Sequence, residues 1–238
     1  GETVQLTLLP PEGEPTVATL PFVLGNAEVA NLGHLPPQLV HFEHRKLDNN
    51  IQMIAFNTFM MPIRQPMTTA FQIIAADNPA GLIIDLRGNL GGLGALGAGL
   101  AGHLISERNL NIGQQITRDG SFYFQVNPRS VSHRYDGPVV VLVDELSVST
   151  SEITAGGLQE LKRARVIGAS TPGKALPSLI IRLPNGDGFQ YVIADLKKPS
   201  GGSYEGDGVT PDETVILTKQ ALQAGEDPML DAALRWLS

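Results

Sequence analysis

The segment VVVLVDELSVSTSEITAGGLQELKRARVIGASTPGK, from Val139 to Lys174, decides how this chain folds. It opens with consecutive apolar residues through Val143, which are typical of a strand covered on both faces in an α/β sheet. A helix pattern follows, with apolar residues near one helical face and cations in the last turn. The segment therefore predicts a buried strand, a serine-rich turn, a helix, a short strand at 166–167 and a loop that ends in Lys174.

Ser149 stands at or just before the N-terminus of the predicted helix. Free backbone N–H groups and the positive end of the helix dipole favour negative charge there, so an alkoxide or an oxyanion would be stabilised. Ser149 and Glu152 also fit a capping box, which is the ordinary role of a serine before a helix. A catalytic role requires a base as well, and the sequence offers Lys174.

Lys174 follows the second strand and lies between Gly173 and the apolar run 175–177. An amine in apolar surroundings loses its charge more readily and can then take a proton from a serine hydroxyl. We expect Lys174 to meet Ser149 if one of the two loops reaches over the end of the sheet.

A second informative stretch is GLIIDLRGNLGG, at 81–92. It predicts a buried strand over Leu82–Leu86, a turn, and then a helix with leucines spaced along one face as far as Leu104. Gly91 and Gly92 at the helix start let a backbone N–H approach a ligand with no side chain in the way. A plain strand-to-helix turn without a ligand is the alternative.

Three phrases occur in one order along the chain: DLRGNLGG at 85–92, SVSTSEI with GASTPGK at 147–153 and 168–174, and GDGVTPD at 206–212. Together they resemble the C-terminal processing peptidases, or tail-specific proteases, which are serine endopeptidases with a Ser-Lys dyad. The resemblance implies an α/β core of the ClpP/crotonase type with β-hairpin additions. It also implies that Ser149 is the nucleophile and Lys174 the general base of an acyl-enzyme mechanism.

The resemblance further implies an oxyanion hole made by the backbone N–H of Thr150 and that of Gly91 or Gly92. One position departs from the family, because Ser178 stands where a glutamine often orients the lysine. A serine can donate and accept hydrogen bonds but reaches less far. Ser178 is therefore expected to orient Lys174 directly or through water, or else to mark a weakened enzyme.

Composition limits the partners of the protein. The chain has 238 residues, a net charge of −7 and a pI near 5.2, which argue against nucleic acid, since phosphate binding requires a basic patch. It has no cysteine, so disulfides and thiolate metal sites are excluded. No apolar run is long enough for a membrane span and no leader is visible, so neither is expected in this chain. The family resemblance implies polypeptide substrates cut near their C-termini, no cofactor and a periplasmic or otherwise extracytoplasmic location, and it leaves a homo-oligomer open.

The N-terminal part predicts a hairpin, with strands at 3–9 and 16–22 around a proline-rich turn. By resemblance this hairpin, residues 1–25, is the end of a truncated PDZ domain, and 26–238 is the peptidase core. A plain hairpin packed on the core is the alternative. Two further hairpins are expected around Asp119-Gly120 and Asn185-Gly186, and a terminal helix is expected from Asp227.

Other functions find less support in the same residues. GASTPGK formally matches a phosphate loop, but Ala175 and a β-rich segment follow where Ser or Thr and a helix are required. A Ser-His-Asp hydrolase lacks a Gly-x-Ser-x-Gly elbow, and His41-x-x-His44 lacks a third metal ligand, so no metal is expected. A non-catalytic protein that binds an apolar ligand or a peptide on the same scaffold is the second hypothesis, which Ser149 and Lys174 oppose.

Overall fold

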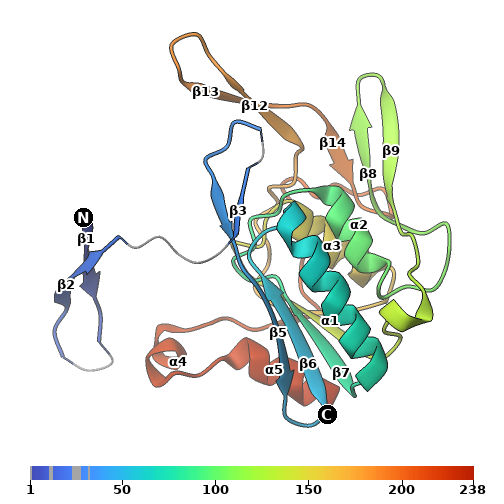
Figure 1. The fold of residues 1–238 in the computed structure, drawn as a ribbon, viewed down its shortest axis with the longest axis horizontal. Helices are drawn as coiled ribbons and strands as arrows, with labels where there is room; N and C mark the ends of the chain where they lie inside the picture. Colours follow the sequence, from blue (N-terminus) through green and yellow to red (C-terminus); the bar gives the residue numbers. More distant parts are fainter. Residues whose placement is uncertain (1, 11–12, 23–27, 32) are drawn as a thin grey trace.

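The computed structural model describes residues 2–10, 13–22, 28–31 and 33–238. The chain forms a mixed α/β fold around a six-stranded sheet with the order β15-β11-β10-β7-β6-β5 (Figure 1). All neighbouring strands in this sheet are parallel except β5 and β6. The strands are β5 (Phe42–Leu47), β6 (Ile51–Phe56), β7 (Gly81–Asp85), β10 (Val139–Val143), β11 (Arg165–Gly168) and β15 (Glu213–Thr214). The predicted α/β class with buried strands is confirmed.

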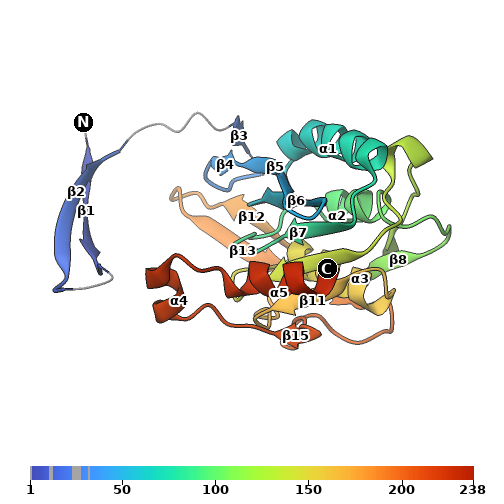
Figure 2. The ribbon, with the colours of Figure 1, turned by 90° about the horizontal axis from the view of Figure 1, so that it is seen from below.

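Helices cover both faces of the sheet, and this explains its continuous apolar strands (Figure 2). In β10, Val141 belongs to a core cluster shared with α1 (Arg64–Asp77), α2 (Gly94–Ala101) and α3 (Thr150–Glu160). Its neighbours Val140 and Leu142 point the other way, into a second cluster with α5 (Pro228–Leu237). Because successive side chains of a strand alternate in direction, a strand covered on both faces must be apolar throughout.

The terminal helix begins as predicted and is tied to the sheet by an ion-pair bridge. The Asp227 carboxylate accepts the Leu230 N–H at 3.0 Å and so caps α5. Arg87, just after β7, donates to Asp85 and to Asp227 at 2.7 Å each. These bonds connect the end of β7 to the last helix, and a short helix, α4 (Lys219–Ala224), precedes it.

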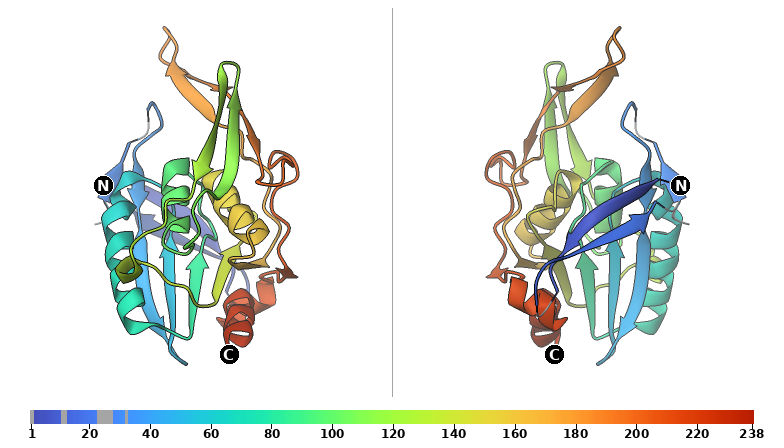
Figure 3. Two further views of the ribbon diagram at one scale, coloured as in Figure 1. Left: turned by 90° about the vertical axis from the view of Figure 1, so that its right-hand side faces the viewer. Right: turned by 90° about the vertical axis from the view of Figure 1, so that its left-hand side faces the viewer.

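Two long hairpins project beyond the end of the molecule at which the parallel strands finish (Figure 3). One pairs β8 (Asn111–Thr117) with β9 (Gly120–Gln125), and β14 (Asp195–Lys197) adds a third strand to it. The other pairs β12 (Ser178–Arg182) with β13 (Gly188–Val192). Both hairpins were predicted from their turn residues, whereas β14 was not.

The N-terminal hairpin, β1 (Thr3–Leu8) with β2 (Thr16–Pro21), forms as predicted. Its side chains are almost all exposed, and it lies beside α4 rather than on the sheet (Figure 1). Gln223 of α4 donates to the carbonyl of Pro10 at 3.0 Å. The interpretation as a PDZ remnant and the domain division at 25/26 stay predictions, and that boundary falls outside the described residues.

Smaller elements complete the chain and depart from the sequence expectation in places. Two 3-10 turns, Met61–Ile63 and Val131–His133, lie in connections. The sequence predicts neither of the short strands β3 (Glu28–Ala30) and β4 (Gln38–Val40), which pair antiparallel. Strand β6 is buried almost throughout, because it lies inside the sheet. No helix of the described residues has the length and apolarity needed to cross a bilayer.

Candidate active site

Three loops that follow adjacent parallel strands form the candidate site. Gly91 follows β7, Ser149 follows β10 and Lys174 follows β11. The carboxyl ends of parallel strands meet at one edge of the sheet, so the loops lie together without either reaching over it. The expectation that one loop must cross the end of the sheet was therefore wrong.

Ser149 occupies a backbone conformation that is unusual for a residue with a side chain. Its φ of 58° and ψ of −114° lie outside the regions that L-residues favour. The turn is held by Glu152, whose carboxylate accepts the Ser149 N–H at 3.0 Å within a capping box. The predicted capping box is confirmed, and the sharp turn presents Ser149 at the start of α3.

Glu152 also holds the lysine loop, a role that the sequence did not reveal. Its side chain is fully buried, and it accepts the Lys174 N–H at 3.0 Å through the same oxygen that binds Ser149. The other oxygen accepts the Gly173 N–H and the Thr171 hydroxyl, at 2.7 Å each. The backbone nitrogens of Ser149 and Lys174 therefore lie within about 6 Å of each other, since both bind one oxygen.

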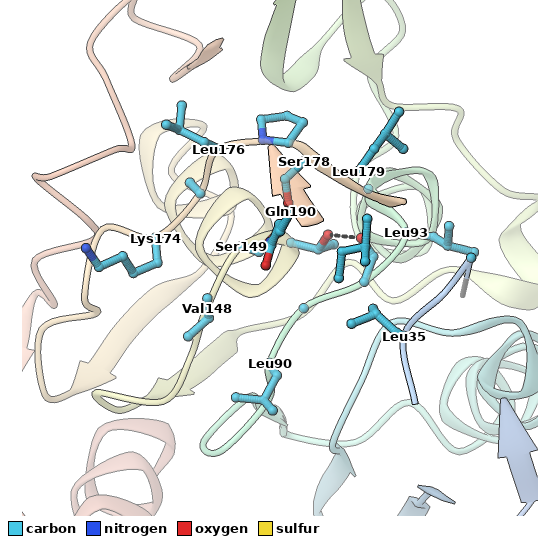
Figure 4. Close-up of a pocket in the computed structure, with 18 of the residues that line it drawn as sticks. Leu35, Leu90, Leu93, Val148, Ser149, Lys174, Leu176, Ser178, Leu179 and Gln190 are labelled. Atoms are coloured by element: carbon cyan, nitrogen blue, oxygen red, sulfur yellow. Dashed lines mark hydrogen bonds between the residues drawn. The ribbon is translucent and has the colours of Figure 1, made fainter. Parts of the chain in front are cut away.

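The side chain of Lys174 does not follow its backbone toward Ser149. Lys174 is exposed although Gly173 and Ala175 beside it are buried, so the expected apolar enclosure is not observed. Figure 4 shows the Lys174 amine directed away from Ser149, and no hydrogen bond joins the two within the described structure. Contact between hydroxyl and amine requires rotation of the lysine side chain.

Asn89 organises the glycine turn against Ser149. Its buried side chain donates to the Phe56 carbonyl at 2.7 Å and accepts the Gly91 N–H at 2.9 Å. Gly91, at φ 85°, lies so close to the serine turn that a Cβ there would be 2.7 Å from the Ser149 Cβ. The Thr150 hydroxyl donates to the Gly92 carbonyl at 2.8 Å, which connects the two turns.

The N–H of Gly91 therefore already donates a hydrogen bond to the Asn89 side chain. Within the described part of the chain, the N–H groups of Gly92 and Thr150 have no hydrogen-bond partner.

A cavity of about 780 Å³ opens over these turns, with Ser149 and Lys174 in its lining. The rest of the lining is mainly apolar and includes Leu176, just before the β12–β13 hairpin, and Leu179 of β12 (Figure 4). Ser178 also lines the cavity, and its hydroxyl accepts a hydrogen bond from the Gln190 amide at 2.7 Å. Ser178 makes no hydrogen bond to Lys174 in the described structure.

The third phrase, GDGVTPD, supports the lysine loop. The Val209 N–H donates to the Thr171 hydroxyl at 2.8 Å, and the Thr171 N–H donates back to the Val209 carbonyl at 3.1 Å. Glu205, just before the phrase, accepts the N–H groups of Ala175 and Leu176 at 2.9 and 3.2 Å. This support depends on tertiary contacts, so no local sequence pattern indicated Glu205.

Four of the five histidines lie outside the cavity lining. His44 pairs with Gln52 at 2.7 Å, and His103 is buried against Phe71, where burial lowers its pKa to about 4. None of the five lines the cavity except His34, and the described residues contain no cluster suited to a metal.

Comparisons with known proteins agree with these features. Residues 50–215 match Peptidase family S41. The carboxyl-terminal-processing protease of Synechocystis sp. is 27% identical over 209 residues, which cover 86% of this chain and 48% of that protein. The chloroplastic C-terminal processing peptidase of Tetradesmus obliquus is 32% identical over 145 residues, which cover 60% of this chain and 30% of that protein. The matched segment thus spans about half or less of these relatives.

Solved structures show the same fold. The photosystem II D1 C-terminal processing protease superposes with a TM-score of 0.65 at 24% identity, covering 85% of this chain and 52% of that one. Mature CPAF complexed with lactacystin superposes with a TM-score of 0.66 at 13% identity, covering 84% of this chain and 54% of that one. The family match covers more than half of the sequence and includes Gly91, Ser149 and Lys174. The chain belongs to peptidase family S41.

Proposed function

We propose that this chain carries the catalytic core of a serine endopeptidase in which Ser149 is the nucleophile and Lys174 the general base. The observation that carries the proposal is the shared oxygen of Glu152, which binds the backbone N–H of both residues. Family S41 membership supports the same reaction class. The fully buried carboxylate fixes the two loops together, so their side chains need only rotate to meet.

The reaction begins when the Ser149 hydroxyl attacks a peptide carbonyl while its proton passes to the uncharged amine of Lys174. The tetrahedral oxyanion then accepts hydrogen bonds from the N–H groups of Gly92 and Thr150, which have no other partner among the described residues. Gly91 lets the glycine turn approach Ser149 closely because it has no side chain. The amine product leaves with the proton from Lys174, and water releases the acyl group.

The exposed orientation of Lys174 belongs to this proposal as a resting state. Lys174 lies on the rim of the cavity with its backbone held, and rotation about its side-chain bonds would carry the amine toward Ser149. A substrate in the cavity would exclude water from the space that the amine then enters.

We propose polypeptides as the substrates, because the relatives are named as carboxyl-terminal-processing proteases. Apolar residues in the cavity lining favour an apolar peptide segment. An extracytoplasmic location, a core of the ClpP/crotonase type and a PDZ origin for the β1–β2 hairpin belong to the same proposal.

The test compares wild type with Ser149→Ala and Lys174→Ala on an unfolded protein that has an apolar tail. We expect cleavage by wild type and a loss of at least a thousandfold in each variant. Lys219→Ala is the matched control, since Lys219 is an exposed lysine on α4, and it should cleave normally.

Cleavage that persists in Ser149→Ala or Lys174→Ala would overturn the dyad. An inert wild type that still binds the tail would support the binding-protein alternative.

A further inference from the structure

We propose that Gln190 is a positioning residue for the peptidase reaction, one that receives the ammonium group of Lys174 after proton transfer. This inference rests on the proposed function, because it assigns a role within the same site. It starts from the hydrogen bond between the Gln190 amide and the Ser178 hydroxyl, at 2.7 Å.

Gln190 reaches the site from a different strand than the lysine loop. Ser178 is the first residue of β12 and comes four residues after Lys174. Gln190 lies on the partner strand β13, opposite Ile180, and extends diagonally to Ser178. Both side chains line the same cavity as Ser149 and Lys174 (Figure 4).

The chemistry of a lysine base creates a need that this pair can meet. A protonated lysine has three N–H donors and no acceptor, so it is stabilised by oxygen acceptors close to the nucleophile. The Gln190 amide uses one N–H on Ser178, and its carbonyl oxygen has no partner among the described residues. The Ser178 oxygen retains a second lone pair.

Two glutamates anchor the backbone at the start of the segment that runs from Lys174 to Ser178. Glu152 holds the Lys174 N–H, and Glu205 holds those of Ala175 and Leu176. The backbone therefore stays in place when the lysine side chain rotates inward. Gln190, held by Ser178, then supplies a neutral acceptor that orients the ammonium without trapping it as a carboxylate would.

The kinetic test uses Gln190→Ala, Gln190→Glu and the double variant Ser178→Gln/Gln190→Ala, with Gln125→Ala as the control. Gln125 is an exposed glutamine on β9 that does not line the cavity. For Gln190→Ala we expect kcat to fall about tenfold with KM unchanged. The double variant should recover most of the loss, because it supplies the carboxamide from β12 instead of β13.

In Gln190→Glu the added carboxylate favours the ammonium, so the acid limb of the kcat profile should move up by about one pH unit. A Gln190→Ala enzyme with wild-type kcat, or a Gln190→Glu profile that does not move, would overturn the assignment.

A second measurement does not depend on cleavage and so separates this inference from the proposed function. The rate at which an amine-reactive reagent labels Lys174 is followed against pH by peptide mass spectrometry. Gln190→Glu should shift the labelling midpoint upward by about half a unit or more, while Gln125→Ala should not. An unchanged midpoint refutes the contact, even for a protein that cleaves well. A shifted midpoint supports the contact, even if no substrate is cut.

Discussion

Ser149 and Lys174 donate their backbone N–H groups to one oxygen of Glu152, at 3.0 Å each. A buried carboxylate thus fixes the separation of two loops that follow different strands. Replacing Glu152 by Gln places an amide N–H group among N–H donors, so at least one hydrogen bond is lost. We expect the free energy of unfolding to fall by about 3 kcal/mol and cleavage to fall more than tenfold. Urea denaturation and peptide hydrolysis measure the two effects.

The control is Glu145→Gln, an exposed glutamate in the turn before Ser149. It should change the free energy of unfolding by less than about 0.5 kcal/mol. Equal behaviour of the two variants would show that the loops are held together by other contacts.

Gly91→Ala should inactivate the enzyme by displacing the serine turn. A Cβ at Gly91 would lie 2.7 Å from the Ser149 Cβ and 2.9 Å from the Thr150 nitrogen, and the φ of 85° is itself unfavourable for alanine. We expect kcat/KM to fall at least a hundredfold.

Gly225→Ala isolates the backbone effect, because Gly225, at the end of α4, has a φ of 73° and open space around it. It should lower the free energy of unfolding by about 1 kcal/mol and leave cleavage nearly intact. If Gly225→Ala and Gly91→Ala lose activity alike, the close approach to Ser149 is not the cause.

Ser149→Gly should be more stable than Ser149→Ala. The positive φ of Ser149 costs a side-chain-bearing residue about 1–3 kcal/mol, and glycine relieves that cost. Both variants remove the hydroxyl, so the comparison separates strain from chemistry. Thermal and urea unfolding of the pair provide the measurement.

At Ser130 the alanine variant should instead be more stable than the glycine variant. The φ of −60° and ψ of 156° at Ser130 suit any residue, so glycine relieves no strain there. The strain interpretation is wrong if glycine is the less stable replacement at both positions.

His103 should make stability depend on pH below neutrality. Burial lowers its pKa to about 4, while the unfolded value is 6.5, so the native state favours the neutral ring. Its stabilising contribution is complete above pH 6.5 and is lost as the pH falls toward 4, because the unfolded chain binds the proton first. The free energy of unfolding falls by about 3 kcal/mol over this pH range.

His103→Phe retains the stacking on Phe71 and should flatten this part of the stability curve, whereas exposed His41→Gln should not. Urea titrations at several pH values measure the free energy of unfolding. An equal pH dependence in wild type and His103→Phe would refute the assignment of this dependence to His103.

The parallel strands of the sheet could be predicted because burial on both faces imposes a continuous apolar run. This holds for β7 and β10, which have no exposed residue. The three-residue strands β3 and β4 could not be predicted, since so short a strand shows no period and depends on its neighbours.

Less of the candidate site than of the central sheet could be predicted from the sequence. Lys174 was expected to be enclosed because its neighbours are apolar, but Gly173 and Ala175 turn inward while Lys174 turns out. Composition along a loop does not determine which side chain faces the interior. Glu152 was recognised as a capping residue, and its second partner, the Lys174 N–H, is brought to it only by the pairing of β10 with β11.

The β12–β13 hairpin beside the cavity is folded from one uninterrupted piece of chain and contributes nothing to the central sheet. Its length and composition can therefore diverge, or be exchanged by grafting, while the glycine, serine and lysine turns keep their spacing. Proteins that share this fold could therefore acquire new substrate preferences by changes in the cavity lining alone.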